Sequence, residues 1–552
     1  MTSSRWAIAA VLAALVMLGY YTLPGNTFLA SDTQIYIPIL ERIWDPSTYP
    51  ADSVALRPHV KYSIYDELAL LLRRITGADS FQGVLIAQQL ATRFCGLLGV
   101  YLLGRALALP PLLALLLPVL YGMGATVAGP AVLTLEYEPV PRGSAICLVV
   151  LALGLMAHAR LQSAALAAGV ALLYHPPTTW PFLTVFGLYL LVEARRKGIA
   201  SLRPLLVIGA FAAGLFVLSR FQAGETEQQA LLHRIDEALA RLQRLRGSYS
   251  WVSLWSAPYI RQYEFLAVFI AAAMWRWREA LTREMRWVCG GMALAGLLSI
   301  PLSYSLLEMA HWSLMPAFQP ARAAAFVFVI AVVLSAAGGV MAAREGRAWE
   351  AAAWFAVGFA LPASWTVLDV LLPDFRDEII TKRWLIVAAA SLATAWGVRA
   401  YSQQRRAASL LLAAALLPYF LLPTWGKVVN YKFVDTPDIA ELAQWARTST
   451  PKQAMFLFAD GAKDPAGSIF RARSLRAVYV DWKGGGQVNL LKEFAEEWWE
   501  RWHSMMDPGY KPERIPEYAA RGIDYIVLTK ANRISELPVL FENSRFLVYK
   551  IR

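Results

Sequence analysis

Residues 6–36 read WAIAAVLAALVMLGYYTLPGNTFLASDTQIY, an apolar run over residues 6–23 followed by a polar segment that contains Asp32. A helix of about 20 apolar residues spans the hydrocarbon core of a bilayer. The run follows one arginine, as in a signal peptide, but it has no clear small-x-small cleavage site and many further apolar runs follow it. We therefore interpret it as a retained first transmembrane helix.

The composition of the whole chain points to the same class of protein. Its 552 residues are 57% hydrophobic and 17% charged, whereas soluble domains are roughly 45–50% apolar and about 25% charged. Apolar runs recur through residues 1–425, which we expect to form a transmembrane helical domain. We place about thirteen spans, two of them short enough to extend into their flanks or to form a re-entrant hairpin. The predicted spans are residues 6–23, 82–103, 109–128, 143–158, 161–174, 177–194, 204–219, 264–276, 287–304, 322–341, 350–372, 384–400 and 407–424.

The distribution of positive charge orients these spans. Short cytoplasmic connections collect Lys and Arg, and with the N-terminus inside every second connection carries such residues, as in 195–203 and 276–286. The pattern predicts a cytoplasmic N-terminus and, with an odd number of spans, an extracytoplasmic C-terminus. In a bacterium the membrane would be the inner (plasma) membrane, and the long connections 24–81 and 221–263 would also lie outside. Because cytoplasmic loops explain the net charge of +12, we do not expect nucleic-acid binding.

The remaining residues, 426–552, alternate between helical and strand periodicity. We predict helices at 438–447, 490–503 and 516–521, and strands at 454–458, 477–481, 525–528 and 545–550. Such alternation is typical of a small α/β domain. The predicted fold is therefore a polytopic α-helical membrane protein with a C-terminal extracytoplasmic α/β domain.

A lysine and three glycines, residues 483–486, lie between a predicted strand and a predicted helix. This position suits a phosphate-binding turn, but the residues match neither the GxGxxG nor the P-loop pattern. We favour the alternative, a flexible loop that reaches toward the membrane site.

Ionisable residues gather at the predicted outer ends of the spans. Each has an ordinary explanation on its own, such as an arginine that pairs with a glutamate in a turn, or a histidine at a helix end. Their joint placement at one membrane face favours a site for a phosphorylated lipid, in which arginine holds phosphate and a carboxylate acts as a base or holds a divalent cation. The candidate residues are Asp32, Glu136, Glu138, Arg142, His175, Gln319 and Arg322.

One arginine and three cysteines lie within predicted spans. Arg93 is the clearest charged residue there, and we expect it either to snorkel toward the interface or to pair with a carboxylate in the bundle. Cys95, Cys147 and Cys289 have no CxxC or Cys/His partner, so neither a disulfide framework nor a zinc site is indicated.

Five short motifs look like those of a group of bacterial membrane proteins. They are Ser31–Tyr36, Asp45–Asp52, Glu136–Arg142, His175-Pro176 and Gln319–Arg322. They accompany a cytoplasmic N-terminus, one span, a long outer loop with an early acidic residue, many further spans and an outer α/β domain. In this layout the whole chain resembles the C-type (GT-C) glycosyltransferases, which use polyprenyl-phosphate sugars. The resemblance implies a lipid-linked sugar donor and membrane lipids as partners.

The resemblance also implies roles for the candidate residues. Asp32 would be the catalytic base that activates an acceptor hydroxyl while the sugar leaves an isoprenoid phosphate, with inversion at the anomeric carbon. Glu136 or Glu138 would help to bind a metal or the acceptor, although the identity of any metal stays open. Arg142 and Arg322 would contact the lipid phosphate.

The chain departs from the family pattern in its first loop, and two other functions remain open. No acidic residue adjoins Asp32; the pair Asp66-Glu67 lies later, on an amphipathic stretch. A transporter of lipid-linked glycans would use the same charges to hold headgroups, although the sequence shows no inverted repeat. A non-catalytic scaffold or assembly protein would bind a partner through its outer domain, with Trp498, Trp499 and Trp502 as anchors, although near-helical spacing favours packing for these residues.

Overall fold

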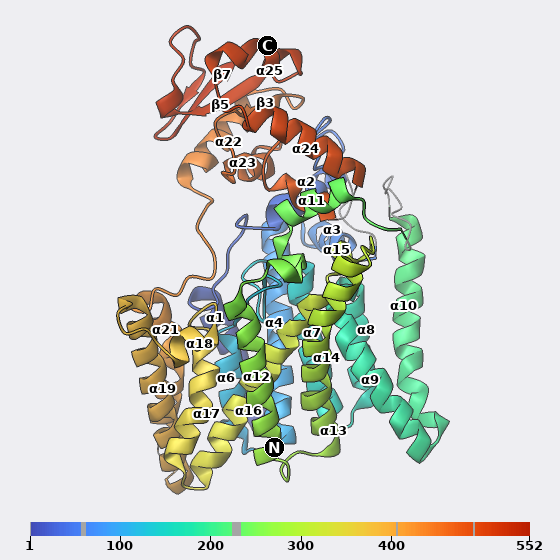
Figure 1. The fold of residues 1–552 in the computed structure, drawn as a ribbon, viewed down its shortest axis with the longest axis vertical. Coiled ribbons are helices and arrows are strands. Elements are labelled where there is room, and N and C mark those ends of the chain that lie inside the picture. The colour runs from blue at the N-terminus through green and yellow to red at the C-terminus, as the bar shows by residue number, and fades with distance from the viewer. Residues whose placement is uncertain (1, 57–61, 223–232, 405–406, 490–491) are drawn as a thin grey trace.

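The computed structural model describes residues 2–56, 62–222, 233–404, 407–489 and 492–552. Long helices run side by side through most of the molecule, and a mixed α/β region covers one end of them (Figure 1). The chain begins near the opposite end of the helices and finishes in the α/β region (Figure 1). This arrangement is the one that an odd number of membrane crossings requires.

Five helical segments among the described residues are long and apolar enough to cross a membrane, by length and composition. They are Phe81–Ala106, Ile199–Phe221, Arg283–Met309, Met315–Arg344 and Glu378–Gln403. Five shorter apolar segments are Arg5–Tyr21, Pro111–Gly122, Pro141–Ala157, Leu161–Tyr174 and Ala408–Thr424. The total of thirteen spans therefore stays a prediction.

The helices of this region are α1 (Thr2–Tyr21), α4 (Phe81–Ala106), α5 (Pro111–Ala114), α6 (Leu116–Gly122), α7 (Pro141–Ala157), α8 (Leu161–Tyr174), α9 (Pro176–Lys197), α10 (Arg203–Phe221), α12 (Ala257–Arg276), α13 (Arg283–Arg286), α14 (Met292–Ser303), α16 (Ala325–Arg344), α17 (Ala348–Ala360), α18 (Val367–Leu371), α19 (Glu378–Gln403), α20 (Ala408–Leu416) and α21 (Pro418–Thr424). Several expected spans have different bounds: within residues 109–128 the helices end at Gly122, and residues 407–424 are divided between α20 and α21. Residues 264–276 are the second part of the longer α12, and residues 350–372 are interrupted between α17 and α18.

Apolar side chains face outward on the peripheral helices. On α10, Leu206 is 75% exposed and Val217 is 55% exposed. The apolar window of Met315–Arg344, which contains α16, is instead 94% buried. An uncharged helix that is apolar on its outer face is stable in hydrocarbon and not in water. The structure therefore supports an integral membrane protein with α16 inside the bundle and α10 at its edge (Figure 1).

Helices α4 and α7 approach each other closely and set the frame of the candidate site. A Cβ atom on Gly99 would collide with the backbone of Val150, and one on Gly154 would collide with the backbone of Gly99. Small residues permit this kind of contact between membrane helices. The contact fixes the start of α7, where Arg142 lies, relative to α4.

Short helices lie at the end of the bundle that meets the α/β region (Figure 1). They are α2 (Thr33–Trp44), α3 (Tyr65–Thr76), α11 (Glu237–Arg246) and α15 (Met315–Phe318). Helices α2 and α3 both lie in the loop 24–81, and α3 covers the amphipathic stretch that carries Asp66 and Glu67. A two-stranded ladder of β1 (Thr126–Val127) and β2 (Val132–Leu133) precedes Glu136. Residues 57–61 and 223–232 of the two long loops lie outside the described part of the chain.

The C-terminal region contains a five-stranded mixed sheet in the order β4-β3-β5-β7-β6. Strand β3 (Met455–Phe458) pairs in parallel with β4 (Ala477–Val478) and β5 (Tyr525–Thr529). Strand β7 (Phe546–Lys550) pairs antiparallel with β5 and with β6 (Phe541–Glu542). The helices here are α22 (Pro437–Ser449), α23 (Ala466–Ser474), α24 (Lys492–Met506) and α25 (Ile515–Ala520).

Most of these α/β elements were predicted, but α23 and β6 were not. Helix α23 escapes a hydrophobic pattern because one of its buried side chains is charged: Arg471 is 1% exposed. Strand β6 has only two residues, too few to show an alternation.

Candidate functional site

Asp32 lies immediately before α2, in a loop that a second carboxylate holds in place. Glu138 Oε1 accepts hydrogen bonds from the backbone amides of Ala30 and Ser31, at 2.7 Å each, and from Thr33 Oγ1 at 2.8 Å. Burial, and then the charge of Asp32, raise the pKa of Glu138. With its side chain buried and bonded to this loop, Glu138 fixes the position of Asp32.

Arg142 joins two of the predicted carboxylates. Its Nη1 donates to Asp32 Oδ2 at 2.5 Å, and its Nε donates to Glu136 Oε1 at 2.7 Å. Pro141 begins α7, so Arg142 lies in the first turn of a helix that its proline helps to start. The Glu136 side chain is 3% exposed and the Asp32 side chain is 25% exposed. Arg142 thus links a buried carboxylate to a carboxylate that solvent and ligands can reach.

A lysine of the α/β region completes the surroundings of Asp32. Lys483 Nζ donates to Asp32 Oδ1 at 2.7 Å and to Ser31 Oγ at 3.3 Å. Burial alone would raise the pKa of Asp32, but Lys483 and Arg142 together hold it well below its ordinary range. Asp32 is therefore ionised at neutral pH.

A buried ion-pair cluster places the segment that carries Lys483. Arg471 donates to Asp52 Oδ2 at 2.6 Å and to Asp481 Oδ2 at 2.5 Å, and the three side chains are at most 4% exposed. Asp52 Oδ2 also accepts from the amide of Val478, and Asp481 Oδ1 accepts from the amide of Gly484. The cluster fastens the first long loop to the α/β region directly beside Lys483.

Arg322 lines a small cavity together with Glu136 and Arg142. Its Nε is buried and has no hydrogen-bond partner within the described chain, and its guanidinium lies 5.5 Å from the centre of the Tyr249 ring. The cavity is small and partly open to solvent. It is lined by Val132, Leu133, Glu136, Arg142, Ile146, Thr178, Arg322, Ala325 and Phe326. The walls are thus mostly apolar, with two arginines and one carboxylate.

Two predicted residues lie behind the cavity. His175, between α8 and α9, has Nδ1 2.9 Å from Thr178 Oγ1, and Thr178 lines the cavity. Gln319 occupies the left-handed turn before Arg322 with φ of 50°, and its Nε2 donates to the carbonyl of Pro316 at 2.8 Å. The residues that line the cavity include neither His175 nor Gln319.

The structure brings in residues that the sequence did not assign to a site. Lys483 belonged to the loop that we expected to reach the membrane site, and the structure confirms that contact. Thr178 and Tyr249 were not predicted, because a threonine and a tyrosine near helix ends carry no pattern of their own.

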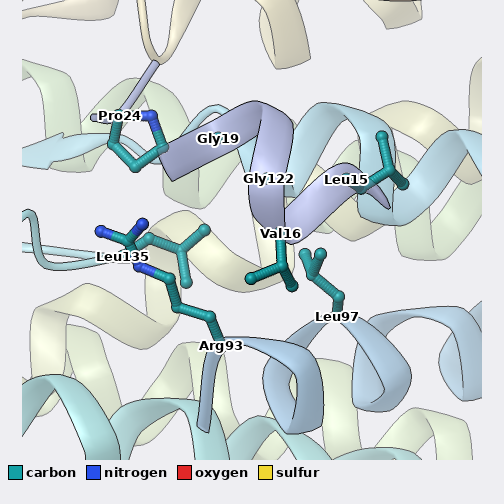
Figure 2. A pocket seen from close by; sticks show the side chains of 8 residues that line it. All are labelled: Leu15, Val16, Gly19, Pro24, Arg93, Leu97, Gly122 and Leu135. Carbon is teal, nitrogen blue, oxygen red and sulfur yellow. The ribbon is translucent and has the colours of Figure 1, made fainter. Parts of the chain in front are cut away.

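Arg93 connects the loop that precedes Asp32 with the segment that contains Glu136. Its Nη2 donates to the carbonyls of Gly25 and Glu136, at 2.8 and 2.5 Å, so it neither snorkels nor pairs with a carboxylate. Figure 2 shows the side chain extending from α4 toward Pro24 and Leu135. Its contacts hold the backbone that precedes Asp32 next to the backbone of Glu136.

The donor set does not fit the divalent cation that the sequence left open. Within the described residues there is no group of three or more His, Cys, Asp or Glu side chains placed to hold a metal ion. Asp32 and Glu136 are instead bound by Arg142.

Comparison with known proteins gives the following matches. The model of a domain of unknown function, DUF6798, matches residues 437–505. No curated protein matches the chain.

Three solved structures are similar to the structure of this chain. ArnT from Cupriavidus metallidurans, bound to undecaprenyl phosphate, is 14% identical with a TM-score of 0.49, over 100% of this chain and 99% of that one. The oligosaccharyltransferase AglB from Archaeoglobus fulgidus, in complex with an inhibitory peptide and a dolichol-phosphate, is 11% identical with a TM-score of 0.40, over 95% of this chain and 69% of that one. The arabinosyltransferase EmbB from Mycobacterium smegmatis is 14% identical with a TM-score of 0.39, over 77% of this chain and 41% of that one. These three are C-type glycosyltransferases, the class that the sequence resembles.

Proposed function

We propose that the protein is an integral membrane glycosyltransferase that moves a sugar from a polyprenyl-phosphate donor to an acceptor on the extracytoplasmic face. One observation carries the proposal: ionised Asp32 adjoins a mostly apolar cavity in which Arg142 is shared between two carboxylates, while Arg322 forms no ion pair with any of the described residues. A buried arginine without an anion is costly. A ligand phosphate would supply that anion.

In this proposal the phosphate and the lipid would contact different walls of the cavity. Guanidinium groups bind phosphate oxygens through paired hydrogen bonds, so Arg322 and Arg142 would hold the donor phosphate. Ile146 and Phe326 would contact the adjoining isoprenoid carbons. Glu136 orients Arg142, since it accepts from its Nε.

Asp32 would take part in the transfer step as the proton acceptor. The acceptor hydroxyl oxygen forms a bond to the anomeric carbon while the bond from that carbon to the phosphate oxygen breaks. The electron pair of the broken bond leaves with the polyprenyl phosphate, and the hydroxyl proton passes to Asp32. The two arginines stabilise the charge that grows on the phosphate. A single displacement of this kind inverts the anomeric carbon.

Two of the three anchors expected for a scaffold are buried, while Trp499 is partly exposed. Trp498 and Trp502 are 2% and 7% exposed, and both rings pack with Trp482. Both side chains thus belong to the core of the α/β region. A transporter would use the same cations to hold a headgroup, so catalysis must be measured directly.

The test is sugar transfer in proteoliposomes from a panel of radiolabelled polyprenyl-phosphate sugars. We expect transfer from one donor by the wild type and its loss in Asp32→Asn. Asp45→Asn is the matched control, because Asp45 lies in the same loop with its side chain 45% exposed and contacts Ser47 and Lys452 on the surface. Transfer that persists in Asp32→Asn would rule out Asp32 as the base. No transfer from any donor by folded wild type would overturn the enzyme proposal.

A further inference from the structure

The three glycines after Lys483 are packed against other elements. A Cβ atom on Gly484 would lie 2.8 Å from the Val54 side chain, and one on Gly486 would lie 3.1 Å from Ile35 of α2. A Cβ atom on Gly485 would collide with the Trp498 ring. Glycine allows the backbone to approach these groups. The loop expected to be flexible is therefore a close-packed one, and only the side chain of Lys483 extends from it toward Asp32.

The same loop touches both sides of the candidate site. At its start, Lys483 bonds to Asp32. At its end, Asn489 Nδ2 donates to the hydroxyl of Tyr249 at 3.2 Å, and the Tyr249 ring faces the guanidinium of Arg322. The backbone of Gly247 lies against the Asn489 side chain as well. Residues 483–489 thus extend from Asp32 on one side of the site to Tyr249, beside Arg322, on the other.

The ion pair between Lys483 and Asp32 is placed to exchange partners. The two side chains are 24% and 25% exposed, so a ligand can reach both. An ammonium group has three donors on a flexible stem, and a phosphate offers more charge and more acceptor oxygens than a carboxylate. A carboxylate bound by two cations is a weak proton acceptor, and losing one of them strengthens it.

We propose that Lys483 is a ligand of the donor phosphate, that it rests on Asp32 when no donor is bound, and that its transfer to the phosphate frees Asp32 to accept a proton. The proton-transfer part rests on the proposed glycosyltransferase function. The phosphate-binding part does not, because it concerns only which anion Lys483 contacts. The α/β region would then contribute a substrate-binding residue to the membrane site.

The test measures binding of a sugar-free polyprenyl phosphate to the full-length protein in nanodiscs, with the matching polyprenyl alcohol and inorganic phosphate as separate arms. Lys483→Met should weaken binding of the polyprenyl phosphate at least tenfold and leave the alcohol unaffected. Lys483→Arg should retain most of the affinity. Lys452→Met is the matched control, because Lys452 also bridges the α/β region to the first loop, through Ser47 and Asp45, but lies on the exposed surface. Inorganic phosphate bound as tightly as the lipid would identify a free-anion site and overturn a lipid phosphate as the ligand.

The sign of a second substitution separates this proposal from a purely structural ion pair. Asp32→Asn removes the competing anion, so it should strengthen polyprenyl phosphate binding several-fold, and most of that gain should vanish in the double variant with Lys483→Met. If the pair only stabilises the fold, Asp32→Asn would weaken binding or leave it unchanged, and the proposal is then wrong. If these binding results hold while no donor supports transfer, the phosphate ligand stands and the glycosyltransferase proposal fails.

Discussion

Replacing Arg471 by methionine should loosen the α/β region from the first loop. The substitution leaves Asp52 and Asp481, which are 0% and 4% exposed, without the cation that both contact. Removing one partner of a buried ion pair costs about 3–5 kcal/mol, because the remaining charge has no compensation. We expect a loss of about that size in the free energy of unfolding of the α/β region. Pulse proteolysis across a urea series would measure it in the full-length protein.

A neighbouring arginine on the same helix provides the control. Arg473 pairs with Asp435 while its side chain is 38% exposed, and exposed ion pairs contribute about 0–1 kcal/mol. Arg473→Met should therefore change stability little. Adding Asp481→Asn to Arg471→Met should recover part of the loss, because one uncompensated carboxylate disappears. The reasoning is refuted if Arg471→Met costs less than about 1 kcal/mol, or if both arginine variants lose the same stability.

Three further predictions concern other parts of the molecule. Burial and the neighbouring Glu67 raise the pKa of Asp66 to about 7. The folded protein therefore loses stability as the pH rises from about 4 to above 7, because the buried carboxyl must ionise. In thermal melts, the melting temperature of Asp66→Asn should match that of wild type at pH 4 and exceed it at pH 8. Gly485→Ala should misplace Lys483, because a Cβ atom there collides with Trp498; a drop in polyprenyl phosphate affinity with a retained fold would show it, and unchanged affinity would contradict it. For orientation, Ser535→Cys should react with a membrane-impermeant maleimide in intact cells and Glu279→Cys only after permeabilisation, with the reverse pattern placing the α/β region inside.

Local features of the chain were predictable where one property of a segment decides its structure. The apolar run at residues 6–23 predicts a membrane helix because span length alone sets the requirement, and α1 covers it. The patterns in 438–550 predicted most of the α/β elements, because helix α22 buries one face and strands β3, β5 and β7 are short, almost wholly buried apolar runs. The prediction missed α23, because its buried Arg471 is charged and is compensated by Asp52, a residue far away in the sequence.

The candidate site divides in the same way. The sequence by itself identified Asp32, Glu136, Arg142 and Arg322 as charged residues at span ends, because charges avoid the hydrocarbon core and gather at its edges. It could not pair them: Arg142 lies 110 residues from Asp32 in the chain, and Lys483 lies 451 residues from it. Only the tertiary structure decided that Arg142 and Lys483 bind Asp32 while Arg322 forms no ion pair within the described part of the chain, because the contacts of a charge depend on which chain segments the packed helices bring together.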